Sequence, residues 1–167
     1  MQADRREVAY LDVSSAALKF ARAAVFVGLL YAAISVYWGL GGTWLLNTVG
    51  GSLQKRAGDA SVVAAVWAAV LLKAVAAVLP LRLVRPRGSP RQIRVIRVMT
   101  WIEAAVLTTY GFGLTAVGLL VQAYVIHASA TADHRALAWH AYLWDPWFLI
   151  WGLLVIGALR AGVNAGE

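Results

Sequence analysis

The sequence predicts an all-α fold, a four-helix transmembrane bundle, on the basis of two observations. Of the 167 residues, 61% are hydrophobic and only 14% are charged, whereas soluble domains carry about 25% charged residues. The hydrophobic residues fall into long blocks, each able to cross a hydrocarbon core of about 30 Å as a helix. We expect a single integral membrane domain over residues 1–167, with spans at about 23–43, 61–83, 98–126 and 136–159.

The first span follows a polar N-terminus, Met1–Arg22, which is typical either of a short amphipathic helix on the membrane surface or of a polar tail. The apolar run behind it is too long for the core of a signal peptide. Within the span, small residues recur at steps of three and four along one helix face, namely Gly28, Ala32, Ser35 and Gly39. Such a face lets two helices approach closely in lipid.

The second span follows a loop rich in Gly, Ser and Asn, and it carries Lys73 near its middle. The third span begins after a short basic loop and carries Glu103 just inside its start. Because this short loop joins the two spans, we expect them to be antiparallel neighbours with Lys73 and Glu103 forming an intramembrane charge pair. The pair would serve either as a proton or ion relay or as a structural bracket.

The third span repeats the pattern of small and polar residues with Gly111, Thr115 and Gly118. This face and the one on the first span leave two alternatives open. They pack helices within the chain, or one of them docks another copy or a membrane partner protein.

The fourth span contains Pro146, so it should be kinked or interrupted there. A helix starting at Pro146 would be too short to cross alone. On a helical wheel Asp145 shares a face with Tyr142 and Gly152, while Trp144 and Trp151 lie on a separate arc. We expect Asp145 to turn inward and the tryptophans to face lipid as anchors.

Orientation follows from the basic residues in the short loops. One side holds Arg5, Arg6, Lys19, Arg22, Arg82, Arg85, Arg87, Arg91, Arg94, Arg97 and Arg160, and the other holds Lys55, Arg56 and Arg135. Both termini are therefore expected in the cytoplasm, with the protein in the plasma membrane. The arginine-rich loop has an alternative role, which is to grip anionic lipid headgroups or an acidic partner.

The outer ends of the spans carry a candidate ligand site. Its members are Asp145, Tyr142, Trp38, Gly42, Trp144 and His140. An aspartate beside an apolar run is costly to bury and needs a partner, and a carboxylate ringed by aromatic side chains suits an organic cation. The alternatives are an ordinary interfacial belt of Trp and Tyr, and a structural hydrogen bond or helix cap for Asp145.

Several kinds of chemistry are excluded or disfavoured. The chain has no cysteine, which rules out disulfides, thiolate metal sites and iron–sulfur clusters. The three histidines match no metal-binding spacing, and no phosphate-binding, dinucleotide-binding or nucleophile motif is present. We therefore expect no metal, no cofactor and no catalytic residue. The net charge of +7 does not indicate nucleic-acid binding, because the arginines adjoin membrane spans and lack interleaved aromatics.

The stretches Tyr37–Trp44 and Trp144–Phe148 together resemble a family of small bacterial four-helix membrane proteins that is catalogued only as a domain of unknown function. The similarity runs from the first span to the last. It implies a four-span membrane protein and supplies no activity, substrate or catalytic residue.

Two classes of function therefore lead. The first is a binding or transport-related module with an outward-facing aromatic and acidic pocket for a lipophilic or cationic small molecule. The second is a structural or accessory subunit that docks a partner or another copy through its small-residue faces, and this requires one such face to point outward. We rank a lipid-modifying enzyme using Asp145 or His140 as general base below both, because no nucleophile accompanies them.

Overall fold

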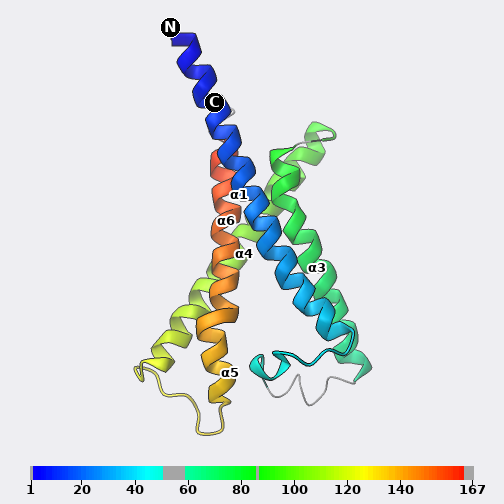
Figure 1. Ribbon diagram of the computed structural model, residues 1–167, viewed down its shortest axis with the longest axis vertical. Coiled ribbons are helices and arrows are strands. Elements are labelled where there is room, and N and C mark those ends of the chain that lie inside the picture. The colour runs from blue at the N-terminus through cyan, green and yellow to red at the C-terminus, as the bar shows by residue number, and fades with distance from the viewer. Residues whose placement is uncertain (1, 51–58, 86, 164–167) are drawn as a thin grey trace.

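The computed structural model describes the backbone of residues 2–50, 59–85 and 87–163 and the side chains of residues 15–50, 59–85 and 87–162. Within these residues every regular element is helical, as the sequence predicts. The elements are α1 (Gln2–Gly39), the 3-10 turn η1 (Leu46–Thr48), α3 (Ala60–Val84), α4 (Pro90–Gln122), α5 (His134–Trp139), the π-helical segment η2 (His140–Trp144) and α6 (Asp145–Val163), arranged as in Figure 1.

Four helical stretches in this part of the chain are long and apolar enough to cross a membrane. They are Ser15–Gly39, Ala60–Val84, Pro90–Gln122 and His134–Gly162, the last running through α5, η2 and α6. Each overlaps one predicted span, so the predicted fold class is confirmed: the chain is a four-helix membrane protein.

Two boundaries differ from the prediction. The polar N-terminus continues into the first span as one helix, α1, instead of forming a separate surface helix or tail. The third span ends at Gln122 and not near residue 126, because Tyr124 adopts a left-handed φ of 59°. The amide of Val125 then donates to the carbonyl of Leu120, which closes the helix in the usual C-terminal reversal.

The helices pack in the order α3–α1–α6–α4, with α1 against both α3 and α6 and with α4 mainly against α6. Helices α3 and α4, although joined by the shortest loop, share a smaller interface. The core lies where small residues from three helices surround the indole of Trp151 on α6, namely Ala24, Ala77 and Ala104. A methyl group added at Gly28 would lie 2.6 Å from this ring, so the small residues make room for one large side chain.

The expectation that the α6 tryptophans face lipid is wrong for Trp144 and Trp151, which are each 1% exposed. Helix α6 has a neighbour on both sides, so it buries two arcs. One arc places Trp151 against Gly28 of α1, and the other places Gly152 against Thr108 of α4. A central helix of this kind has no single buried face, so a helical wheel does not show which residues face lipid.

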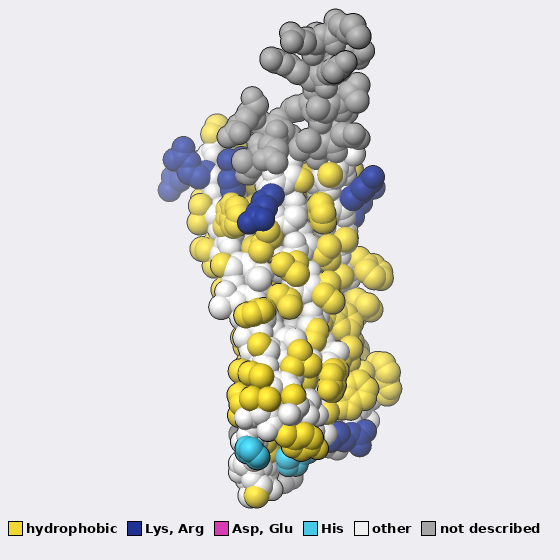
Figure 2. Space-filling view, turned by 90° about the vertical axis from the view of Figure 1, so that its left-hand side faces the viewer, with side chains coloured by type: hydrophobic (Ala, Val, Ile, Leu, Met, Phe, Trp, Pro, Cys, Tyr) yellow, Lys and Arg dark blue, Asp and Glu magenta, His cyan; other side chains and the backbone are white. Residues whose placement is uncertain are grey.

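Both termini lie at the same end of the bundle as the turn between α3 and α4, and the opposite end carries η1 and α5 (Figure 1). We call the first the arginine end, after Arg82, Arg85, Arg87, Arg91, Arg94 and Arg97, and the second the aromatic end. In Figure 2 the Lys and Arg side chains of the visible face gather mostly near the top and the His side chains near the bottom, with hydrophobic side chains between them.

The small-residue faces of α1 and α4 both lie against neighbouring helices of the same chain. A methyl group added at Gly111 would meet the backbone of Leu149, and one at Gly118 would lie 2.9 Å from the Cβ of Ala141. On α1, Ala32 and Ser35 are buried. Gly39 approaches the indole of Trp67 on α3. The Thr115 hydroxyl is also buried, without a hydrogen-bond partner in the described part of the chain.

Candidate functional site

The last span is widened by the π-helical segment η2 immediately before Pro146. A proline has no N–H and its ring clashes with the carbonyl four residues earlier, so the ordinary hydrogen-bond ladder cannot pass through it. Here the amide of Asp145 donates to the carbonyl of His140, five residues back. The helix therefore continues across Pro146 with a local change of phase, which agrees with the kinked span expected from the sequence.

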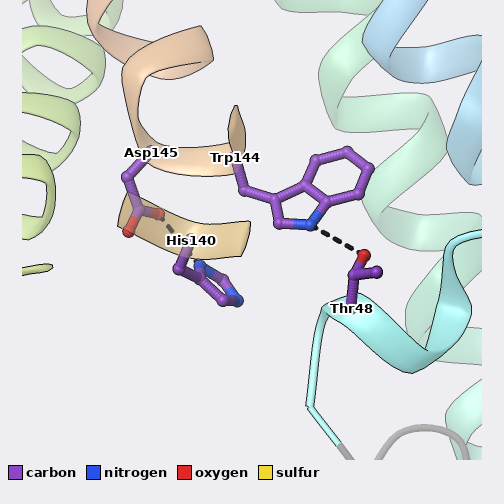
Figure 3. Close-up of polar contacts among 4 residues, drawn as sticks. All are labelled: Thr48, His140, Trp144 and Asp145. Carbon is purple, nitrogen blue, oxygen red and sulfur yellow. Dashed lines mark hydrogen bonds and ion pairs between the residues drawn. The ribbon is translucent and has the colours of Figure 1, made fainter. Parts of the chain in front are cut away.

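This change of phase joins His140 to Asp145 through their side chains as well. The imidazole Nδ1 lies 3.1 Å from the Oδ1 of Asp145 (Figure 3). Asp145 is 3% exposed, whereas about a third of the His140 side chain is open at the aromatic end. The carboxylate thus has the partner that its burial requires, and that partner comes from its own helix.

A second contact ties the loop after α1 to the same helix. The indole N–H of Trp144 donates to the Oγ1 of Thr48 over 3.1 Å (Figure 3), and the Thr48 hydroxyl donates to the carbonyl of Leu45 over 2.6 Å. Thr48 is almost fully buried. The turn η1 therefore folds under the bundle and closes the aromatic end.

An aromatic cluster fills the space above this turn. We define it as Tyr31 and Trp38 of α1 with Trp144, Trp147 and Phe148. Tyr31 is its centre, with ring centroids 4.8–5.8 Å from those of the last three members, and Trp38 lies 5.6 Å from Trp144. Three of these four ring pairs meet edge to face and the Tyr31–Trp147 pair is tilted. Edge-to-face pairs add about 0.5–1.5 kcal/mol each beyond area burial. The two aromatic stretches of the sequence therefore meet at one end of the bundle.

The candidate ligand residues do not gather around Asp145 as one site. Tyr142 is 65% exposed and points away from the bundle. Gly42 lies beside the ring of Tyr37. Trp38 contacts Trp144 edge to face, and its indole N–H donates to the carbonyl of Trp44. The structure brings together His140 with Asp145, and Trp38 with Trp144.

The structure also does not join Lys73 to Glu103. The Lys73 ammonium donates to the hydroxyl of Ser35 over 2.8 Å and lies 4.1 Å from the centre of the Tyr31 ring. Both oxygens of Glu103 are buried with no hydrogen-bond partner among the described residues. Lys73 and Glu103 do not meet because α3 packs mainly against α1. Lys73 therefore faces α1, although α4 is the helix that follows α3 in the sequence.

Lys73 lines a groove of about 220 Å³ between α1 and α3. Its other walls are Ser35, Trp38, Val62, Ala65, Val66 and Ala69. The groove is therefore apolar except for one ammonium and one hydroxyl. Asp145 does not line it.

Sequence reasoning missed Tyr31 and Thr48 and gave Ser35 only a packing role. Tyr31 sits among apolar residues in the first span, and Thr48 follows an ordinary loop pattern, so neither carried a signal. Ser35 could have been paired with Lys73 only if α1 and α3 were known to be neighbours. In the part of the chain that the structure describes, no three His, Cys, Asp or Glu side chains come close enough to hold a metal ion.

Comparison with known proteins identifies a family whose function is unknown. A sequence model of the family described as "Protein of unknown function (DUF3995)" matches residues 27–155, from within α1 to within α6. No curated protein and no solved structure matches the chain.

Proposed function

This chain belongs to that family of unknown function, as its resemblance indicated, and we propose a role for it from the geometry of the bundle. The protein binds a lipophilic small molecule whose polar group is a hydrogen-bond acceptor, either a carboxylate or a carbonyl. The acceptor contacts Lys73, and the apolar part lies in the groove between α1 and α3. The protein is a binding or transport-related module of the plasma membrane, with both termini in the cytoplasm.

The observation that carries the proposal is the unneutralised ammonium of Lys73. A charge within a membrane span is costly, and such residues usually pair with an opposite charge or mark a ligand or ion pathway. No carboxylate pairs with Lys73 among the described side chains; its contacts are the neutral hydroxyl of Ser35 and the face of Tyr31. An ammonium has three N–H donors, so donors remain for a ligand.

The groove suits part of a ligand. Its volume of about 220 Å³ is below the roughly 300–1,000 Å³ of sites that enclose a drug-sized molecule. A ligand would place its acceptor and a few carbons between α1 and α3 and leave the rest in lipid. Since Trp38 and Ser35 lie in the half of α1 near the aromatic end, entry from the outer leaflet follows from the proposed orientation.

The other readings have less support. A cationic ligand needs an accessible carboxylate, but Asp145 is buried and bonded to His140. An accessory subunit that docks through small residues needs an outward-facing seam, but Gly28 and Gly111 lie against α6. The proposed orientation rests on the basic residues of the arginine end, and a C-terminal reporter active only outside the cell should give no signal.

Photolabelling with a diazirine-bearing fatty acid tests the groove. We expect Lys73→Met, which removes the charge, and Ala69→Leu, which fills the groove, each to lower labelling about tenfold, the equivalent of roughly 1.4 kcal/mol. Ala68→Leu is the matched control, because Ala68 is exposed and outside the groove. Labelling at the wild-type level in both groove variants, with unchanged gel-filtration profiles, would refute the proposal.

A further inference from the structure

A second groove lies at the arginine end, between α3 and α4, and is larger than the first. Its volume is about 750 Å³. The deeper wall is apolar and consists of Val75, Val78, Leu79, Val95 and Ile96. The mouth carries Arg82, Arg87, Ser89, Arg91 and Gln92. The interface of α3 with α4 is smaller than those of α1 with α3 and of α4 with α6, which leaves room for the groove.

Among the residues whose side chains the structure describes, the three arginines at the mouth have no counter-charge. No carboxylate pairs with Arg82, Arg87 or Arg91 among the described side chains. Of the four described acids, Asp59, Asp133 and Asp145 belong to the opposite end, and the carboxylate of Glu103 on α4 is buried. Guanidinium groups bind phosphate oxygens in pairs and with fixed geometry. Three of them around one opening leave an excess of positive charge that an anion would neutralise.

The start of α4, which lies between Arg87 and Arg91, is fixed by a capping box. The amide of Ser89 donates to the Oε1 of Gln92 over 2.9 Å, and the Ser89 hydroxyl accepts from the amide of Gln92. Pro90 occupies the first position of α4, where its fixed φ suits a helix start. Arg87 and Arg91 therefore lie on either side of a well-defined helix start.

From the arginines at the mouth, the apolar wall of the groove extends along α3 and α4 toward the middle of the membrane. Val75 is 59% exposed and Val95 is 55% exposed, one on each helix. In a bilayer this surface is covered by hydrocarbon. A molecule that fits both parts has a phosphate-bearing anionic head and an acyl chain attached to it.

We propose that this groove binds an anionic phospholipid of the cytoplasmic leaflet, with phosphate at Arg82, Arg87 and Arg91 and an acyl chain against the valine wall. Basic pockets between spans on the cytoplasmic side bind such headgroups. Three cations exceed the charge of a single phosphate diester, so a lipid with two phosphates is preferred over one with a single phosphate. This site is independent of the groove at Lys73 and does not rest on its occupancy.

Native mass spectrometry of the full-length protein, with defined lipids added, tests the site without any variant. The probes are a two-phosphate lipid (a cardiolipin), a phosphatidylglycerol, a phosphatidylcholine and inorganic phosphate. We expect retention in that order, with phosphate alone not retained. Equal retention of phosphatidylcholine and cardiolipin would overturn the proposal, and so would equal retention of inorganic phosphate, because the acyl chain would then contribute nothing.

Two triple variants separate the groove from general positive charge. Replacing Arg82, Arg87 and Arg91 by Gln should weaken cardiolipin binding at least about a hundredfold, because each lost hydrogen bond to a charged phosphate contributes about 1.5–3 kcal/mol. Replacing Arg85, Arg94 and Arg97 by Gln removes the same charge from the same end but outside the groove, and it should change binding less than about fivefold. Equal losses of cardiolipin binding in the two triple variants would overturn the proposal. If the first triple variant does not fold, the order of lipid retention on the wild-type protein still tests it.

Discussion

Replacing Gly111 by alanine should push α4 away from α6. The added methyl group would lie 2.8 Å from the Cα of Leu149 and 2.9 Å from the carbonyl carbon of Phe148. Carbon atoms in contact prefer about 3.5–4.0 Å, so the two helices must separate by about 1 Å. Because the neighbours are backbone atoms, no side-chain rotation can relieve the clash.

The expected penalty for Gly111→Ala is about 1–3 kcal/mol, the usual range for overpacking. Alanine also favours the helix over glycine by up to about 1 kcal/mol, which offsets part of this. Gly113→Ala is the matched control, because it makes the same exchange two residues away with nothing within 4 Å of the new methyl group. The difference between the two variants therefore isolates the helix contact.

The assay is equilibrium unfolding of both variants in mixed micelles with a graded denaturing detergent, followed by the fluorescence of the buried tryptophans. Gly113→Ala should unfold at or above the wild-type midpoint, and Gly111→Ala clearly below it. If the two midpoints coincide, the close approach of α4 to α6 does not hold in the protein and the packing order derived from it fails.

Three further tests of the buried polar groups use the same assay. A double-mutant cycle of Trp144→Phe and Thr48→Val should give a coupling of about 1 kcal/mol; no coupling would mean that η1 does not stay docked. Asp145→Leu should lower stability by about 1–3 kcal/mol more than Asp145→Asn, because asparagine can still bond to His140; equal effects would contradict this pairing. Glu103→Leu should keep or raise the midpoint, since both carboxylate oxygens are buried without a partner among the described residues; a loss of stability of more than about 1 kcal/mol would reveal a partner.

The spanning helices were predictable because membrane insertion depends on a property that each segment carries alone. A block of apolar residues such as 61–83 must satisfy its backbone polar groups internally, whatever surrounds it. The small-residue faces were visible for a similar reason, since Gly28 and Gly111 mark close approach before the partner helix is known.

The side-chain contacts between different helices could not be predicted from the local sequence pattern. Lys73 bonds to Ser35, which is 38 residues away in the sequence, and this depends on α3 packing on α1. The contact between Trp144 and Thr48 spans 96 residues and depends on how a loop folds back. The pairing of His140 with Asp145 required the π-helical phase change, which the position of Pro146 suggested without fixing its register.

The packing order also constrains how the bundle assembles during synthesis. Helices α1 and α3 can pair as soon as both are inserted, but α4 meets its main neighbour only when α6 arrives as the last span. Until then the faces of Ala24, Ala77 and Ala104 surround no indole, because Trp151 belongs to that last span. Insertion and packing are separable stages for membrane helices, and here the second stage waits for the C-terminal span. A chain truncated before His134 would therefore keep three spans able to cross the membrane but would lack the side chain that fills their centre.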